Sequence, residues 1–311
     1  MSFWFLGLSL ICALALTWLA MPTLIRYFIA KKEGQQIREE GPTWHAKKSG
    51  TPTMGGLMFV LAATFSTLLT GWLAGQLTAM LWAVLLVWIV YSLIGMWDDS
   101  IKIFRQQNEG FKPWQKFLCQ VIAAIIFVAI FRSDDPSVGW LYMAFIVFWL
   151  VGFSNAVNLT DGLDGLVTGL ATISFSAYLI LALFQHQYDV AIFCTAVIGS
   201  LIGFFPFNHK PAKIFMGDMG SLALGGALAA VAIMVHHPWS LLLIGLIYVI
   251  ETASVILQVF WFRRTGKRIF KMTPIHHAFE MDGWSEWKID YVFWLVQLVA
   301  AAISVIVLMA I

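Results

Sequence analysis

The sequence has little charge for its length. Only 12% of its 311 residues are Asp, Glu, Lys or Arg, whereas these residues make up about 25% of a typical soluble domain. Hydrophobic residues account for 60% of the chain. This composition excludes an ordinary soluble domain and indicates an integral membrane protein.

Cysteine is also scarce. Cys12, Cys119 and Cys194 lie in apolar stretches, and their spacing fits no metal-ligand pattern, so we expect small buried side chains rather than a disulfide framework. Basic residues are missing before the first apolar run, Phe3 to Ala20, and begin only at Arg26. We therefore expect this run to be a retained membrane span, not a cleaved signal peptide, with its N-terminus outside.

The chain contains many long apolar runs. A helix that crosses the membrane needs about 20 predominantly apolar residues. The runs predict an all-α integral membrane fold with about ten transmembrane helices, at residues 3–24, 53–72, 78–97, 115–131, 139–157, 165–184, 189–206, 219–235, 240–262 and 291–311. The whole chain, 1–311, is predicted to be one membrane domain, with a long insertion at residues 263–290.

Basic residues are almost absent from every second connection between the predicted spans. Of the nineteen, only Arg132 falls in an even-numbered connection. The others fall in the first, third, seventh and ninth connections, at Arg26, Lys31, Lys32, Arg38, Lys47, Lys48, Lys102, Arg105, Lys112, Lys116, Lys210, Lys213, Arg263, Arg264, Lys267, Arg268, Lys271 and Lys288. Because lysine and arginine accumulate on the cytoplasmic side, the pattern predicts cytoplasmic odd-numbered connections and extracytoplasmic termini.

Five short polar islands interrupt the apolar sequence, and all five fall on the predicted cytoplasmic side. They are residues 48–56, 98–102, 158–165, 208–221 and 274–277. A transporter usually places its polar residues near the middle of the bilayer, often in paired broken helices. The position of the islands at one face favours an enzyme whose active site lies at the cytoplasmic face.

One island holds two adjacent carboxylates, Asp98 and Asp99, at the end of the third predicted span. Carboxylates at the membrane boundary are costly, and this makes them functional candidates. Lys102 shares a helix face with both acids, so an ion pair at the helix end is the alternative interpretation.

A second island leads into the sixth predicted span. Asn158, Asp161 and Asp164 recur every three residues, with Gly162 and Gly165 among them. Glycines permit close backbone approach, and a helix N-terminus presents free N–H groups to an anion. Capping of the helix by one of the two aspartates is the alternative.

The island around Asp218 is glycine-rich and also precedes a span. A carboxylate in this setting, near Lys210 and Lys213, suits a Mg²⁺ ion that bridges to phosphate. Capping of the helix by Asp218 is an equal alternative. Asn208 could support the metal or a phosphate oxygen.

The remaining islands are less specific. Residues 48–56 begin with Lys48 but lack the G-x-x-x-x-G-K-[ST] order, which excludes a soluble P-loop NTPase. His276 and His277 are adjacent and have no cysteine nearby, which argues against zinc and leaves hydrogen bonding to phosphate or a plain surface loop. Glu251 is the one acid well inside a span, where it is a functional candidate or makes a structural hydrogen bond, with Gln258 or with another helix.

Together the islands resemble the phospho-N-acetylmuramoyl-pentapeptide-transferase family, within the polyprenyl-phosphate sugar-1-phosphate transferase superfamily. The resemblance runs from about Gly41 to Trp287. The motifs that carry it are Lys-Ser-Gly-Thr-Pro-Thr-Met-Gly-Gly, Asn-Leu-Thr-Asp-Gly-Leu-Asp-Gly-Leu, Pro-Ala-Lys-Ile-Phe-Met-Gly-Asp-Met-Gly-Ser and Pro-Ile-His-His. The family usually has three consecutive histidines, and here Ala278 stands in the third position.

The resemblance implies transfer of phospho-MurNAc-pentapeptide from its UDP carrier to undecaprenyl phosphate in the bacterial inner membrane, giving lipid I and UMP. It implies a homodimer with Mg²⁺ as cofactor and membrane lipid as a partner, and no nucleic acid. Asp218 is the implied metal ligand, and Asp98, Asp99, Asp164 and His276 are the implied catalytic residues. Implied substrate-binding residues are Lys48, Thr53, Lys102, Lys116, Asn158, Asp161, Asn208, Phe215 and His277.

Two alternatives remain open for the function and three for Asp98. The chain could be a sister transferase that uses UDP-GlcNAc, or a transporter of a phosphorylated lipid or nucleotide sugar. The second pKa of a lipid phosphate is about 6, so the acceptor is mostly dianionic near neutral pH. We therefore expect Asp98 mainly to orient the acceptor, and to deprotonate it as a base only if nearby carboxylates raise that pKa. A two-step route with Asp98 as nucleophile also stays open.

Overall fold

The computed structural model describes residues 2–31, 48, 50–105 and 110–310, which fold into helices joined by short loops. Ten of these helices are long and apolar enough to cross a membrane, so the predicted number of spans is confirmed. They are α1 (Trp4–Lys31), α2 (Gly56–Ala74), α3 (Ala79–Arg105), α4 (Pro113–Asp134), α5 (Trp140–Thr160), α6 (Leu166–Phe184), α7 (Tyr188–Asn208), α8 (Gly217–Met234), α10 (Leu246–Thr265) and α12 (Glu286–Ala310).

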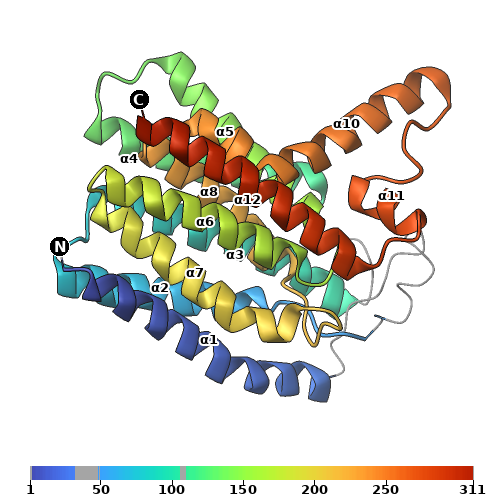
Figure 1. Cartoon of the computed structure of the whole chain (residues 1–311), viewed down its shortest axis with the longest axis horizontal. Coiled ribbons are helices and arrows are strands. Elements are labelled where there is room, and N and C mark those ends of the chain that lie inside the picture. The colour runs from blue at the N-terminus through green and yellow to red at the C-terminus, as the bar shows by residue number, and fades with distance from the viewer. Residues whose placement is uncertain (1, 32–47, 49, 106–109, 311) are drawn as a thin grey trace.

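The long helices form one bundle with two distinct ends. Both chain termini lie at the same end of this bundle (Figure 1). At the opposite end α10 leans away from its neighbours, and the short helix α11 (Ile275–Met281) lies beside it. The loops that hold the polar islands gather at this second end.

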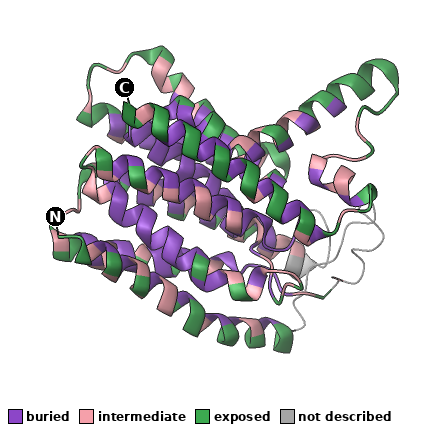
Figure 2. Cartoon of the chain, viewed as in Figure 1, coloured by how far each residue is buried: buried purple, intermediate pink, exposed green. Residues whose placement is uncertain are grey.

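Helix α8 forms the centre of the bundle. It packs against α3 on one side and α5 on another, and nearly all its residues are buried (Figure 2). Its sequence is rich in glycine and alanine, and small residues of this kind let neighbouring helix backbones approach closely. The outward faces of α1, α10 and α12 instead expose large apolar side chains, as expected where helices meet lipid.

Four predicted spans differ clearly from the observed helices. The first helix continues to Lys31, seven residues past its predicted end at residue 24. The third helix continues to Arg105, so Asp98 and Asp99 lie inside it and not at its end. The last helix begins at Glu286, five residues earlier than predicted. The ninth predicted span, residues 240–262, is divided into the short helices η2 (Pro238–Ser240) and α9 (Leu241–Ile244) and the long helix α10.

The division before α10 lies at Gly245 and leaves backbone groups without helical partners. Side chains from neighbouring helices bind these groups. Ser174 donates to the carbonyl oxygen of Ile244 at 2.9 Å, and Gln297 accepts from the amide of Ile247 at 3.1 Å. A broken helix is tolerated inside a membrane protein when neighbouring side chains satisfy the freed backbone in this way.

Candidate active site

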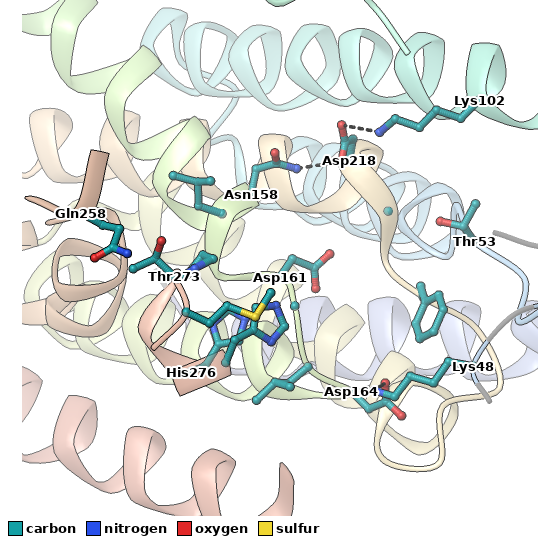
Figure 3. A pocket seen from close by; sticks show the side chains of 18 of the residues that line it. Lys48, Thr53, Lys102, Asn158, Asp161, Asp164, Asp218, Gln258, Thr273 and His276 are labelled. Atoms are coloured by element: carbon teal, nitrogen blue, oxygen red, sulfur yellow. Dashed lines mark hydrogen bonds and ion pairs between the residues drawn. The ribbon is translucent and has the colours of Figure 1, made fainter. Parts of the chain in front are cut away.

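A cavity of about 770 Å³ lies at the end of the bundle away from the termini. Figure 3 shows Lys102 and Asp218 on one wall, Lys48 and Asp164 on another, and His276 on a third. Of the predicted site residues, those that line it are Lys48, Thr53, Asp99, Lys102, Asn158, Asp161, Asp164, Asn208, Phe215, Asp218, His276 and His277. Asp98 and Lys116 lie just behind the wall and contact lining residues. The structure thus brings all five islands together.

Three carboxylates meet where α3 packs on α8. Oxygen atoms of Asp98, Asp99 and Asp218 all lie within 4.8 Å of one another. Asp98 and Asp99 are buried, and Asp99 accepts a hydrogen bond of 3.2 Å from the amide of Met219, the residue that follows Asp218. Like charges this close require a proton or cations nearby.

Two lysines supply the positive charge. Lys102 Nζ lies 2.5 Å from Asp98 Oδ2 and 3.2 Å from Asp218 Oδ2, and Lys116 Nζ lies 2.7 Å from the same Asp218 oxygen. Asn158 donates to the other Asp218 oxygen at 2.8 Å. The expected ion pair of Asp98 with Lys102 is therefore present, but it is only one part of a larger network.

The capping interpretation of Asp218 was wrong, because α8 has no side-chain cap. The expectation that Lys210 and Lys213 lie beside Asp218 was also wrong. Lys210 pairs with Glu286, and Lys213 lies 6.0 Å from the centre of the Phe207 ring.

The carboxylate cluster fits a hard divalent cation. Mg²⁺ binds one or two carboxylates at a time and takes its other ligands from water and substrate phosphates. Asp218 Oδ2 now contacts both Lys102 and Lys116, so a cation bound there would take the place of a lysine contact. Asp98, Asp99 and Asp218 are the residues that could hold it.

The opposite wall is built on a second ionic network. Lys48 Nζ lies 2.7 Å from Asp164 Oδ1 and 2.8 Å from Glu286 Oε2, and Lys210 Nζ lies 2.8 Å from Glu286 Oε1. The other Asp164 oxygen accepts from the amide of Ala212 at 3.0 Å. Asp164 therefore does not cap α6, whose N-cap residue is glycine without a side-chain bond.

Charge and burial act differently on two groups of the cavity. Burial would lower the pKa of Lys48, but the carboxylates of Glu286 and Asp164 outweigh it and raise that pKa above its usual value. Burial raises the pKa of Asp161 to about 8, and the charges of Asp218, Asp99 and Asp164 act in the same direction. Asp161 follows α5 and caps no helix N-terminus. Its carboxyl group therefore holds a proton more readily than that of a free aspartate.

Backbone pairing joins two of the islands. The Phe215 amide donates to the carbonyl of Pro52 at 2.8 Å, and the Gly55 amide donates to the carbonyl of Phe215 at 2.8 Å. Asn208 accepts from Thr168 at 2.7 Å and donates to a backbone carbonyl at 3.2 Å. The amide of Asn208 thus braces the loop as well as lining the cavity.

Each histidine of the last island faces a carboxylate. His276 Nδ1 lies 3.1 Å from Glu251 Oε1, and His277 Nδ1 lies 2.7 Å from Glu280 Oε2. The interpretation that Glu251 bonds to Gln258 was wrong, because Gln258 binds the backbone of residues 269 and 270 instead.

Sequence reasoning missed cavity-lining residues such as Arg268 and Thr273, and it missed Glu286, which holds Lys48 at the wall. Glu286 stands in the first turn of α12, where an acid is ordinarily explained by the helix dipole. Its two lysine partners are 238 and 76 residues away, so no local pattern reveals them. The only indication in the sequence was that Lys48 and Lys210, in the first and seventh connections, had no acidic partner nearby in the chain.

We expect Glu286→Gln to lower the free energy of unfolding by about 2 kcal/mol, because Glu286 is buried and holds two lysines. Thermal unfolding of the detergent-solubilised protein measures the change. Asp282→Asn is the matched control, since its ion pair with Lys271 is exposed and should contribute less than about 0.5 kcal/mol. Equal stability of the two variants would contradict the structural role of Glu286.

Comparison with known proteins gives one matching family model and one matching family signature. Residues 81–236 match glycosyl transferase family 4. Residues 48–60 match phospho-N-acetylmuramoyl-pentapeptide-transferase signature 1, which covers the first polar island.

Curated relatives match over nearly their whole length. The chain is 68% identical to the phospho-N-acetylmuramoyl-pentapeptide-transferase of Limosilactobacillus fermentum, over 98% of each chain. It is 61% identical to the protein of the same name from Lactiplantibacillus plantarum, over 96% of this chain and 97% of the relative. For Enterococcus faecalis the identity is 53%, over 97% and 98%.

Proposed function

Because the chain belongs to the phospho-N-acetylmuramoyl-pentapeptide-transferase family, we propose that it transfers phospho-MurNAc-pentapeptide from UDP-MurNAc-pentapeptide to undecaprenyl phosphate, giving lipid I and UMP. One observation carries the proposal: five islands scattered over the sequence surround a single cavity of about 770 Å³ with carboxylates and lysines on its walls. Such a site suits a reaction between two phosphorylated substrates.

We place this cavity on the cytoplasmic face of the bacterial inner membrane. The cavity lies at the end of the bundle opposite both termini (Figure 1). Eighteen of the nineteen basic residues fall in odd-numbered connections, which end at the cavity side. The termini would then be extracytoplasmic, and residues 263–290 would be a cytoplasmic insertion of a single membrane domain.

Phosphoryl transfer depends on alignment and on neutralising charge more than on covalent chemistry by the protein. We propose that Asp218 holds Mg²⁺ together with Asp98 or Asp99. When bound there, the ion would neutralise pyrophosphate charge and stabilise UMP as it leaves. Lys102 and Lys116, which lie at the same carboxylate, would bring positive charge to the phosphates of the two substrates.

The surroundings of Asp98 support a positioning role. Its Oδ2 contacts Lys102, and its Oδ1 accepts a 2.7 Å hydrogen bond from the amide of Phe111. Asp98 is 4% exposed and does not line the cavity. A carboxylate engaged in this way holds Lys102 in place, and this favours a one-step transfer over attack by Asp98.

The lipid chain of the acceptor would lie along α10. One exposed face of this helix carries the apolar residues Val255, Ile256, Val259 and Phe260 and ends at Arg263 and Arg264. Val259 and Arg263 also line the main cavity, so this face adjoins it. An apolar helix face that ends in arginines suits an isoprenoid chain with a phosphate head.

We also propose that the protein is a homodimer, as the family resemblance implies. Light scattering on the detergent-solubilised protein, corrected for bound detergent, tests this. A mass of one chain at all concentrations would contradict it.

The function is tested by incubating the purified protein with Mg²⁺, undecaprenyl phosphate and one UDP-sugar. We expect release of UMP with UDP-MurNAc-pentapeptide and none with UDP-GlcNAc. Release with UDP-GlcNAc alone would establish the sister transferase, and no release with either donor would reject the enzyme. Without the lipid acceptor, no phospho-sugar should become attached to the protein, and a trapped adduct on Asp98 would establish the two-step route.

A further inference from the structure

The pair formed by His276 and Glu251 is unusual for a membrane helix. Both side chains are fully buried, and the ring atom Nδ1 lies 3.1 Å from Glu251 Oε1. Glu251 belongs to α10 and His276 to α11, so the contact joins the divergent helix to the histidine helix. A buried carboxylate requires a nearby cation or proton. Among the described residues, His276 is the basic side chain that lies within ion-pair distance of Glu251.

The second histidine repeats the arrangement. His277 Nδ1 lies 2.7 Å from Glu280 Oε2. The two rings stand 4.2 Å apart in an edge-to-face arrangement. Two imidazolium groups at this distance would repel each other, and a separate carboxylate on each one offsets the repulsion. Both histidines therefore present the same nitrogen, Nδ1, to an acid.

The other ring nitrogen of His276, Nε2, lies against Gly162 in the cavity wall. A Cβ atom placed on Gly162 would lie 2.3 Å from His276 Nε2, so this nitrogen touches the loop that carries Asp161 and Asp164. His276 also lines the main cavity. Among the described residues, neither ring nitrogen of His276 and neither carboxylate oxygen of Glu251 has a partner with hydrogen-bond geometry, so the 3.1 Å approach of Nδ1 to Glu251 is an ion-pair contact, and Nε2 is buried against Gly162. A buried ring nitrogen of this kind is ordinarily paired, and a ligand in the cavity could supply the partner.

We propose that Glu251 is a positioning residue that acts through His276: it holds a proton on Nδ1 and turns Nε2 toward the phosphate groups of the substrate. The proposal rests on the proposed transferase function. With a carboxylate on one nitrogen and a phosphate oxygen on the other, the ring is held as an imidazolium, and Nε2 donates its hydrogen to the phosphate. Removing the charge of Glu251 weakens that donor without touching the substrate.

A double-mutant cycle tests the proposal. Wild type, Glu251→Gln, His276→Gln and the double variant are compared by UMP release. Glu251→Gln should lower kcat/KM for the nucleotide donor by about 10–100-fold, the loss typical when the hydrogen-bond partner of a metal-bound histidine is replaced. The double variant should be no slower than His276→Gln, because the carboxylate then has no ring to position. Additive losses, or a normal rate for Glu251→Gln, would overturn the proposal.

Two further variants separate positioning from general stability. Ser254→Ala, on the same buried helix face, removes only a hydrogen bond to the Glu251 carbonyl and should keep the wild-type rate. Glu251→Asp keeps the charge and should be faster than Glu251→Gln. It also replaces Glu251→Gln in the cycle if that variant does not fold. An aspartate variant no faster than the glutamine variant would count against a role for charge.

A measurement independent of catalysis completes the test. NMR spectra are recorded on protein labelled with ¹⁵N-histidine. The ring signals of His276 are identified as those that disappear in the His276→Gln variant. They should show a protonated Nδ1 in wild type and a mixture of tautomers in Glu251→Gln. Identical His276 signals in the two proteins would overturn the proposal. If wild type releases no UMP with either donor, the proposed function fails, while the ring signals still decide the role of Glu251.

Discussion

Replacing Asp218 with asparagine should lower the rate of UMP release by about 10³-fold or more, equivalent to about 4 kcal/mol of transition-state stabilisation. Asp218 is the carboxylate that both Lys102 and Lys116 contact, and Asn158 donates a hydrogen bond to it. Asparagine keeps the size of the side chain but removes its charge. Its amide group would also turn donors toward lysines, which are donors themselves.

The same variant should respond differently to Mg²⁺. If Asp218 is a metal ligand, chelation of divalent ions abolishes wild-type activity, and excess Mg²⁺ restores it, whereas Asp218→Asn recovers little at any concentration. Asp189→Asn is the control, because Asp189 lies at the start of α7, at the other end of the bundle, and contacts Thr78. Retention of more than a tenth of the activity by Asp218→Asn would contradict its assignment as the principal ligand.

The spans were predictable because their signal is local. A helix surrounded by lipid needs a continuous apolar run, and ten such runs stand out against polar connections. The prediction failed where a helix extends past the apolar run, as α3 does beyond Asp98, because hydropathy reports the membrane and not the helix end. It failed again at Gly245, where the apolar run continues through a break that Ser174 and Gln297 stabilise from other helices.

The site was predictable as a set of residues but not as a network. The islands were identified by composition, and the structure brings them to one cavity. Which lysine meets which carboxylate depends on packing across long sequence separations, such as 102 residues for Lys116 and Asp218. Proximity along the chain favoured Lys210 for Asp218, but Lys210 lies on the opposite wall with Glu286. The capping interpretations failed for the same reason, because acids next to helix starts found distant partners.

Gly95→Ala should remove most of the activity although Gly95 carries no chemistry. A Cβ atom at this position would lie 2.2 Å from the carbonyl oxygen of Asp218 and 2.4 Å from the amide nitrogen of Met219. Both are backbone atoms that cannot rotate away, so α3 and α8 must separate. That separation moves Asp98 and Asp99 away from Asp218 and weakens the bond from the Met219 amide to Asp99.

The activity of Gly95→Ala should fall by about 10²-fold, as expected for a displacement of about 1 Å between groups that act together. Strain in the packed centre should also lower the free energy of unfolding by about 1–3 kcal/mol. Gly152→Ala is the matched control, because Gly152 lies inside α5, and a Cβ atom there would meet nothing within 4 Å. It should keep full activity and be at least as stable as wild type, since alanine favours helix more than glycine does.

UMP release and thermal unfolding are measured for Gly95→Ala and Gly152→Ala. The comparison separates the effect of the α3–α8 backbone contact from the effect of helix propensity. Equal activity would mean that α3 and α8 are not in backbone contact at Gly95. A stable but inactive Gly95→Ala would show that the distance between the paired aspartates and Asp218 limits the rate. The metal-binding carboxylates would then depend on a residue without a side chain, because only glycine lets the two helices bring them within reach of one ion.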